Sequence, residues 1–190
     1  MSINIGFGIC GSFCNFSRIF GVLENLVNKG YNIYPVVSFA AFKIDTRFGL
    51  AKDNIERIEN ICGKKVISKI EDAEPIGPQN LVDIIVVAPC TGNTLGKIAS
   101  GITDTPVTMA IKSHLRNQKP VLIGVSTNDG LAASAKNIGE LLNRKNIFFL
   151  PMKQDDYINK PLSIVADFEK TEEAIKEALK YKQIQPIYVN

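Results

Sequence analysis

The 190-residue sequence has no tryptophan, one histidine and only four cysteines, and each scarcity excludes a class of protein. Four scattered cysteines are too few for a disulfide-stabilised scaffold of this length, so we expect reduced thiols, as in cytosolic proteins. A zinc site needs several cysteine or histidine ligands. Cys10 and Cys14 are not followed by a second pair, and His114 stands alone. We therefore predict no metal site.

The chain also lacks a strong charge imbalance and any long apolar run. Its 22 Lys and Arg against 19 Asp and Glu give a formal net charge of +3, far from the basic surface of a nucleic-acid-binding protein. The apolar runs are much shorter than the roughly 18 residues that a membrane-spanning helix requires. The first residues do not have the basic and apolar segments of a secretory signal. We expect a cytoplasmic protein that binds neither nucleic acid nor membrane.

The sequence is 45% hydrophobic, and apolar runs of strand length alternate with segments of helical periodicity. This alternation is typical of a parallel sheet with helices on both faces. We predict one α/β domain, residues 1–190, with a three-layer, doubly wound, mostly parallel sheet that is flavodoxin-like or Rossmann-like. The predicted strands are 3–9, 31–37, 66–67, 84–88, 121–125 and 147–150, and the predicted helices are 16–27, 55–62, 94–100, 106–115, 131–142 and 172–182, with loops over 68–79 and 152–161.

Ligands of such sheets bind beyond the carboxyl ends of the strands, so the residues that follow each strand are the candidates for function. These segments are rich in hydroxyls, amides and glycines: Cys10-Gly11-Ser12-Phe13, Ser38-Phe39, Pro89-Cys90-Thr91-Gly92-Asn93-Thr94 and Ser126-Thr127-Asn128-Asp129. Gly11 and Ser12 suit a phosphate, because an unobstructed backbone, a hydroxyl and the amides of the next helix would surround it. Ser38 could add a second hydroxyl, although helix capping explains such serines equally well.

The first glycines also fit another pattern. Residues 6–11, Gly-Phe-Gly-Ile-Cys-Gly, have the spacing of a dinucleotide-binding loop. However, Gly6 and Gly8 fall inside the predicted first strand, and the second strand ends without the carboxylate that would bind a ribose. We interpret these two glycines as positions where a helix packs closely on the strand, and we do not predict a dinucleotide site.

A longer motif is more specific. Residues 88–104 read Ala-Pro-Cys-Thr-Gly-Asn-Thr-Leu-Gly-Lys-Ile-Ala-Ser-Gly-Ile-Thr-Asp. With the Gly-Ser of the first loop and the hydroxyl of Ser38, this motif resembles the homo-oligomeric flavin-containing cysteine decarboxylases, a flavoprotein family. The resemblance spans about residues 3–150 and implies a flavodoxin-like fold that binds FMN. It predicts cofactor contacts by Gly11, Ser12, Phe13, Ser38, Cys90, Thr91, Gly92, Asn93 and Thr94, with the phosphate at the first loop.

The chain departs from these decarboxylases at two places. Glu74-Pro-Ile-Gly-Pro78 lacks their histidine before the central strand, and Ser126-Thr-Asn-Asp129 replaces a Pro-Ala-Met-Asn substrate clamp. Both stretches resemble another flavoprotein branch, the B subunits of dipicolinate synthase. So do Gly101-Ile-Thr-Asp-Thr-Pro106, His114-Leu-Arg-Asn117 and several residues of the segment 154–167. These motifs are unlinked in sequence, so the resemblance covers nearly the whole chain.

That branch implies a two-subunit enzyme of spore-forming bacteria. The enzyme would oxidise a cyclic dihydrodipicolinate-type precursor to dipicolinate, pyridine-2,6-dicarboxylate, during sporulation. The dipicolinate synthase A subunit would be the partner and would bring the dinucleotide-binding domain with its NAD(P). The resemblance also implies a homo-oligomer, a small dicarboxylate substrate, and a place in the mother-cell cytoplasm.

Within that enzyme we predict Asn93 and Asp129 as catalytic residues and Ser126, Thr127 and Asn128 as substrate-binding residues. Helix capping is the alternative for the asparagines and for Asp129. Two other functions stay open. The chain could be a binding or scaffold subunit without chemistry of its own, since no acid–base pair is obvious, or an FMN-dependent decarboxylase of a phosphorylated cysteine derivative.

Other reactive or charged residues have simpler interpretations. Cys90 has no histidine beside it in sequence, so we favour a small apolar role over a nucleophilic one. His114 lies on an apolar helical stripe near a helix end, and we interpret it as structural and favoured by the helix dipole. A dicarboxylate would need cations, and a flat ring could be covered by aromatic side chains. By location the candidates are Lys43, Arg47, Lys97 and Lys153, and Phe13, Phe39 and Phe42, although a surface or core role suits each of them.

Overall fold

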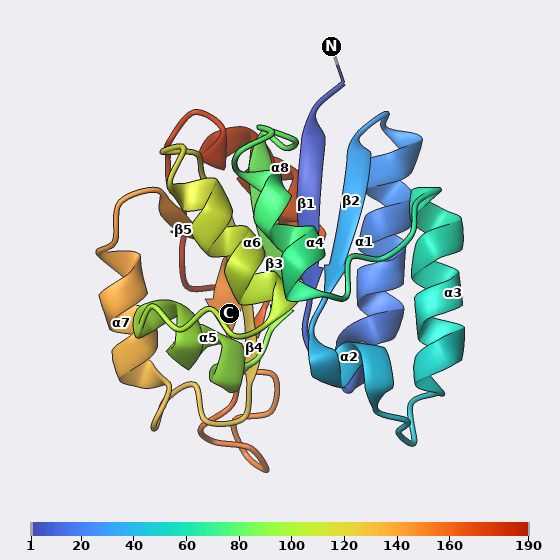
Figure 1. The fold of residues 1–190 in the computed structure, drawn as a ribbon. Coiled ribbons are helices and arrows are strands. Elements are labelled where there is room, and N and C mark those ends of the chain that lie inside the picture. Colours follow the sequence, from blue (N-terminus) through green and yellow to red (C-terminus); the bar gives the residue numbers. More distant parts are fainter. Residues whose placement is uncertain (1, 190) are drawn as a thin grey trace.

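Seven strands form a sheet through the middle of the molecule (Figure 1), and the computed structural model describes residues 2–189. The spatial order is β2-β1-β3-β4-β7-β6, and β5 also pairs with β4. The first five strands are parallel, whereas β7 is antiparallel to both β4 and β6. The bounds are β1 Asn4–Ile9, β2 Asn32–Val37, β3 Ile84–Cys90, β4 Val121–Thr127, β5 Ile147–Phe149, β6 Met152–Lys153 and β7 Ile164–Ala166.

This order confirms the predicted doubly wound, mostly parallel sheet, and it is that of a flavodoxin-like fold. The chain runs outward from β1 to β2 and then crosses back to β3 on the other side of β1. The reversal places a topological switch point between the carboxyl ends of β1 and β3, where such folds bind their ligands.

Helices cover both faces of the sheet and define two hydrophobic cores. One core joins α1, α3 and α8 to the sheet, and the other joins α5, α6 and α7 to the opposite face. In Figure 1, α4, α5 and α6 lie in front of the sheet. The helices are α1 Phe16–Asn28, α2 Phe39–Lys43, α3 Ala51–Cys62, α4 Ile70–Ala73, α5 Gly92–Ala99, α6 Pro106–Leu115, α7 Ala135–Leu142 and α8 Thr171–Ala178, with 3-10 turns η1 Phe13–Asn15, η2 Glu74–Ile76 and η3 Phe168–Lys170.

Local sequence explains how these elements form. Every residue of β3 is buried, which fits its apolar run at the centre of the sheet. The helix α6 begins with a capping box between Thr105 and Thr108 and with Pro106 at its first position, where a missing N–H costs nothing. A Cβ on residue 8 would lie 3.1 Å from a methyl of Val107. Gly8 therefore lets α6 pack closely on β1, as predicted. The same prediction for Gly6 was wrong, because a Cβ there would lie 3.1 Å from Ile85 of the neighbouring strand β3 and meet no helix.

The structure differs from the sequence prediction at several elements. The strand β3 runs to Cys90, two residues beyond the predicted end, and α7 starts at Ala135 rather than near residue 131. Turns precede α7 because the carbonyl of Asp129 accepts the N–H groups of Ala132 and Ser134. The predicted loop 68–79 contains α4 and η2, and the predicted loop 152–161 begins with β6. Residues 66–67 contribute only one isolated bridge, from Ile67 to β2.

The Glu74–Pro78 motif has a structural role against α6. A Cβ on residue 77 would lie 2.1 Å from the carbonyl oxygen of Ser113, so only glycine fits there. The Gly77 N–H donates to Ser113 Oγ at 2.9 Å, and Asn117 Nδ2 donates to the Gly77 carbonyl at 2.6 Å. Two motifs that are distant in sequence, 74–78 and 114–117, thus meet in one contact.

Among residues 2–189, no helix has the length and apolar composition that crossing a bilayer demands.

Candidate functional site

A cavity of about 1050 Å³ lies at the carboxyl ends of β1, β3 and β4. The loops after these three strands line it together with α7 and the segment 155–165, which connects β6 to β7. This is the edge of the sheet that contains the switch point between β1 and β3. The cavity brings together ten of the predicted site residues: Gly11, Ser12, Phe13, Thr91, Gly92, Asn93, Ser126, Thr127, Asn128 and Asp129.

Three predicted residues do not line this cavity. Ser38 is buried, and its hydroxyl accepts the Ala41 N–H at 3.2 Å, so it caps α2 as the simpler alternative predicted. Cys90 is fully buried because β3 extends through it. Thr94 is buried in the first turn of α5, where its hydroxyl accepts the Thr91 hydroxyl at 3.3 Å.

Capping does not account for the asparagine and aspartate side chains at the site. The N-cap of α5 is Thr91, whose hydroxyl accepts the Thr94 N–H, and Asn93 is exposed at the cavity. The residue before α7 is Ser134, five residues after Asp129. The Asp129 carboxylate instead accepts side-chain hydroxyl groups, as described below.

The first of two polar clusters, which we call the amide cluster, consists of Ser12, Asn15 and Ser126. The hydroxyl oxygens of Ser12 and Ser126 lie 2.8 Å apart. Asn15 Nδ2 donates to Ser126 Oγ at 2.8 Å and to Ser12 Oγ at 3.2 Å. These contacts tie the loop after β1 to the end of β4 across 111 residues or more of sequence, and all three residues line the cavity.

The second, the carboxylate cluster, consists of Thr127, Asp129 and Ser134. Both hydroxyls donate to the same carboxylate oxygen, Asp129 Oδ1, the Ser134 hydroxyl at 2.9 Å. The Thr127 hydroxyl, with a further contribution from Ser134, lowers the pKa of the Asp129 carboxyl below its ordinary value. Asp129 is therefore an anion at neutral pH, with both neighbouring hydroxyl protons already directed to it.

Glycine is the only residue type that fits at position 92, against the carboxylate cluster. A Cβ on residue 92 would lie 2.7 Å from the hydroxyl oxygens of Thr127 and Ser134. It would also lie 2.9 Å from Asp129 Oδ1. Such distances are shorter than Cβ atoms tolerate, so any residue larger than glycine would displace the cluster. Gly92 and the segment 126–129 thus depend on each other.

The two buried cysteines near the site are protonated thiols. Burial raises the pKa of the Cys10 thiol to about 11, and burial raises that of Cys90 well above its ordinary value. Neither side chain is the thiolate that nucleophilic chemistry needs. The small apolar role predicted for Cys90 agrees with its position in the second hydrophobic core.

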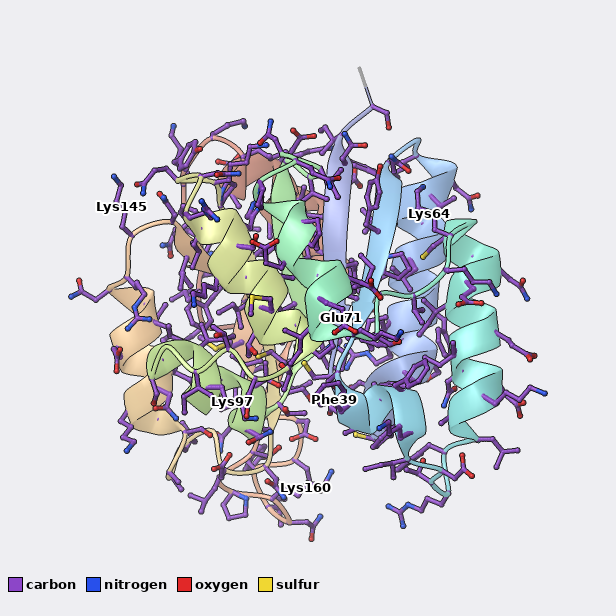
Figure 2. All side chains as sticks on the ribbon, in the orientation of Figure 1. Phe39, Lys64, Glu71, Lys97, Lys145 and Lys160 are labelled. Atoms are coloured by element: carbon purple, nitrogen blue, oxygen red, sulfur yellow. The ribbon has the colours of Figure 1, made fainter. Side chains whose placement is uncertain are left out.

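The cations at the cavity are not the ones that sequence position suggested. Lys136 and Lys160 line it, whereas Lys97 donates to Asp104 at 2.7 Å outside it. Figure 2 shows Lys160 beyond the carboxyl ends of the strands, and Lys145 toward the opposite end. Lys160 pairs with Asp155 at 3.3 Å. Burial opposes ionisation of Asp155, but hydrogen bonds from Ser163 and Lys160 outweigh it and lower the pKa of that carboxyl.

The aromatic side chain that reaches the cavity beside Phe13 is Phe48, not Phe39 or Phe42. Phe48 is exposed, and the Arg47 guanidinium lies 4.9 Å from the centre of its ring. Both belong to the segment between α2 and α3, whose turn is held by backbone bonds between Thr46 and Gly49.

His114 is structural and lies far from the cavity. It is 1% exposed, and its Nε2 lies 3.1 Å from the Pro120 carbonyl. Burial lowers the pKa of His114 to about 4, so the neutral ring is the form at pH 7. The predicted structural role agrees with this burial, but the expected benefit from the helix dipole was wrong, since desolvation outweighs it.

Comparison with known proteins places this chain in a family. A family model named Flavoprotein matches residues 1–179. The chain belongs to the Flavoprotein family.

Two relatives from dipicolinate synthases are similar over almost the full length of the flavoprotein chain. The B subunit of the Bacillus subtilis enzyme is 44% identical over 185 residues, which cover 97% of this chain and 92% of the relative. The crystal structure of the B subunit from Bacillus halodurans has a TM-score of 0.91 and 39% identity, and covers 100% and 99% of the two chains. The FMN-dependent cysteine decarboxylase SpaF shares the fold, with a TM-score of 0.71, 22% identity and coverage of 94% and 96%.

Sequence reasoning missed several residues of the flavoprotein's cavity. Asn15 follows Ser12 by three residues, the spacing of one helical turn, and that spacing could have indicated it. Ser134 could not be found in this way, because its side chain meets Asp129 only through the turns before α7. Others at the cavity are Phe48, Lys136, Asn137, Asp155, Lys160 and Ser163.

No metal centre stands out in the part of the flavoprotein that the structure describes: residues 2–189 contain no group of three histidine, cysteine, aspartate or glutamate side chains that could hold a metal ion.

Proposed function

We propose that this flavoprotein is the B subunit of a dipicolinate synthase and takes part in oxidising a dihydrodipicolinate-type precursor to dipicolinate. The observation that carries the proposal is the 44% identity to the Bacillus subtilis B subunit over 97% of this chain and 92% of that relative. At that coverage the similarity is not confined to one part of the fold. The partner A subunit would supply NAD(P).

The cavity fits FMN as a bound cofactor, which is the second part of the proposal. Its volume of about 1050 Å³ exceeds the lower end of ligand pockets, about 300 Å³, by a wide margin. The Gly11 N–H donates no hydrogen bond to another described residue, and a Cβ on residue 11 would lie 3.2 Å from that of Ala40. Gly11 with the hydroxyls of the amide cluster would hold the phosphate. FMN would supply redox chemistry or a binding surface next to Asn93.

Asp129 would act through its charge. Removing a hydride from a dihydropyridine-type ring leaves positive charge on the ring until a proton also departs. The hydride goes to NAD(P)⁺ and the proton to water, so the reaction balances. An ionised carboxylate stabilises that developing charge. Because its pKa is lowered, Asp129 is a poor proton acceptor, and we assign it this electrostatic role. Asn93, Ser126, Thr127 and Asn128 would orient the dicarboxylate.

A second candidate is a binding subunit without chemistry of its own, and one observation favours it. No histidine lines the cavity among the described residues, and the pKa values of both lining carboxyls, Asp129 and Asp155, are lowered. Neither carboxyl is poised for proton transfer near pH 7. In this candidate the A subunit would carry out hydride transfer alone.

The FMN-dependent decarboxylase stays as a third alternative, supported by the fold of SpaF. Decarboxylases of this kind use a histidine that this chain lacks before β3, and the corresponding segment 74–78 packs on α6. We also propose a homo-oligomer that joins the A subunit in the mother-cell cytoplasm during sporulation.

Co-expression with the A subunit tests the main proposal. The purified complex should convert precursor and NAD(P)⁺ to dipicolinate, and the absorbance of the pyridine product and of NAD(P)H should rise together. The Asp129→Asn variant should assemble and be slower by about 10-fold or more, since an electrostatic contribution of a few kcal/mol is typical. A complex that assembles but forms no product would contradict the proposal. Full activity of Asp129→Asn would support the binding-subunit candidate. Release of carbon dioxide by the isolated chain would support the decarboxylase.

A further inference from the structure

The amide cluster contains a fixed number of hydroxyl protons, and counting them shows what it can offer a ligand. Asn15 Nδ2 has two protons, and it donates one to each serine oxygen. The two serine oxygens lie 2.8 Å apart, so one hydroxyl donates to the other. The hydroxyl that donates has used its proton. The other accepts two hydrogen bonds and keeps its own proton free.

The cluster therefore has one free O–H donor, and the acceptors of the receiving hydroxyl are filled. The Cys14 thiol is the only competing partner among the described residues, at 3.9 Å from Ser12 Oγ and 3.5 Å from Asn15 Nδ2. Sulfur at such distances is a weak acceptor. Because all three residues line the cavity, the free proton is available to a ligand there.

We infer that Asn15 is a positioning residue that makes Ser12 and Ser126 present one hydroxyl donor to an oxyanion of the ligand. The inference rests on the proposed function, since it assigns the anion-binding end of the same cavity. Asn15 is 8% exposed and lies in η1, directly before α1. Because its amide protons are donated to Ser12 and Ser126, it acts on the ligand's anion indirectly, by directing these two hydroxyls.

The oxyanion has two possible sources, the phosphate of FMN and a carboxylate of the dicarboxylate. Both accept hydrogen bonds and carry negative charge, and a hydrogen bond to a charged group is stronger than one between neutral groups. The neighbouring carboxylate cluster cannot serve, because Asp129 takes both hydroxyl protons there. Gly11 adds an unobstructed backbone beside Ser12.

The substitution Asn15→Asp tests this directly, because it keeps the shape of the side chain and reverses its polarity. The new carboxylate would accept the protons of both serines, and no donor would face the cavity. We expect FMN to bind about 10- to 100-fold more weakly, the effect of losing a hydrogen bond to a charged group. Riboflavin, which lacks the phosphate, should bind with less than about threefold change, since its ring contacts are untouched.

Three further measurements separate positioning from a general effect of charge or of misfolding. Asn137→Asp adds a charge elsewhere in the cavity and should weaken FMN binding by a far smaller factor than Asn15→Asp. Lowering the pH should restore FMN binding to Asn15→Asp relative to wild type, since protonating the carboxylate returns a donor. Asn15→Leu has a similar shape and removes the amide that directs the two hydroxyls, while one serine proton stays free. It should weaken FMN binding less than Asn15→Asp and more than Asn137→Asp, which keeps the test available if Asn15→Asp does not fold.

The matched pair dipicolinate and pyridine-2,6-dicarboxamide repeats the comparison for a carboxylate source. If the Asn15 variants bind only FMN more weakly, the amide cluster holds the phosphate. If they bind only dipicolinate more weakly, it holds a carboxylate. If the Asn15 variants bind both anions as wild type does, or lose the uncharged analogues equally, the inference is overturned and the proposed function stands. If the wild-type chain, alone and with the A subunit, binds neither FMN nor dipicolinate, both fail.

Discussion

The amide cluster and the carboxylate cluster lie at one cavity and have the same plan, yet they offer a ligand opposite things. Each consists of two hydroxyl side chains held by one central group. In the first cluster the Asn15 amide donates to the hydroxyls, and one hydroxyl proton stays free. In the second the Asp129 carboxylate accepts both hydroxyls, and no hydroxyl proton is left. One end of the cavity suits an anion and the other suits a positive centre.

The comparison shows that hydroxyl-rich loops cannot be assigned to a ligand from composition alone. Serine and threonine occur at both ends of the cavity, and the direction of their protons depends on a neighbour that can be distant in sequence. A dicarboxylate ring that becomes positively charged during oxidation has both kinds of group, which is the chemistry that the proposed function requires.

Replacing Gly92 by alanine should cause the largest loss of stability, because it disturbs the carboxylate cluster. The added Cβ would lie 2.7 Å from two hydroxyl oxygens of the carboxylate cluster, and forced repacking of this kind costs about 1–3 kcal/mol. Urea-induced unfolding should show this loss of free energy of unfolding. Gly96→Ala is the matched control in the same helix, because its Cβ would meet only the Asn137 amide, at 3.4 Å. Removal of a helical glycine there should stabilise, by up to about 1 kcal/mol. Equal effects at the two positions would contradict the packing described for Gly92.

Removing one hydroxyl from each cluster should separate their roles. Ser126→Ala removes one of the two hydroxyls from the amide cluster. The Ser12 hydroxyl then has no serine partner to fix its direction, so FMN should bind about 10-fold more weakly, which corresponds to about 1.4 kcal/mol. Ser134→Ala removes one donor to Asp129 and should change FMN affinity by no more than about twofold. Titrations followed by flavin fluorescence measure both. A larger loss of FMN affinity for Ser134→Ala than for Ser126→Ala would mean that the anion binds at the carboxylate cluster, which would contradict this assignment.

The smallest expected effect is on acid stability. The folded-state pKa of Asp129 is lowered, so its ionised form contributes stability that is present above the unfolded pKa, about 3.9, and lost as pH falls through the folded value. Asp129→Asn should reduce the free energy of unfolding at pH 7 by less than about 1 kcal/mol, because the group is partly exposed. The difference from wild type should shrink steadily as the pH falls from about 4 through the lowered folded-state pKa of Asp129. A difference that does not shrink over that range would mean that ionisation does not stabilise the cluster.

Much of the fold is predictable from the sequence because apolar runs and helical periodicity report burial directly. The parallel sheet with helices on both faces follows from that pattern, whereas the strand order β2-β1-β3-β4-β7-β6 does not. Strand ends are less predictable. The apolar run stops at Ala88 and so predicts a loop at Cys90, whereas pairing with Val125 continues the strand through Cys90.

The site was predictable as a set of loops and not as a set of contacts. The rule that ligands bind at strand ends selected the segments after β1, β3 and β4, and these do meet at the cavity. The same rule wrongly placed Ser38 with them, since its hydroxyl is used by α2. The contact of Asn15 with Ser126 depends on how two distant segments pack, which no local pattern reveals.

Amide hydrogen exchange with and without FMN tests the central claim, that the ends of neighbouring strands form one receptacle for an anion and a ring. Bound FMN should slow exchange together in residues 11–13, 91–93 and 126–129, three segments that only the fold brings into contact with one cavity. Protection confined to a single one of these segments, or found instead at the opposite end of the sheet, would contradict the account.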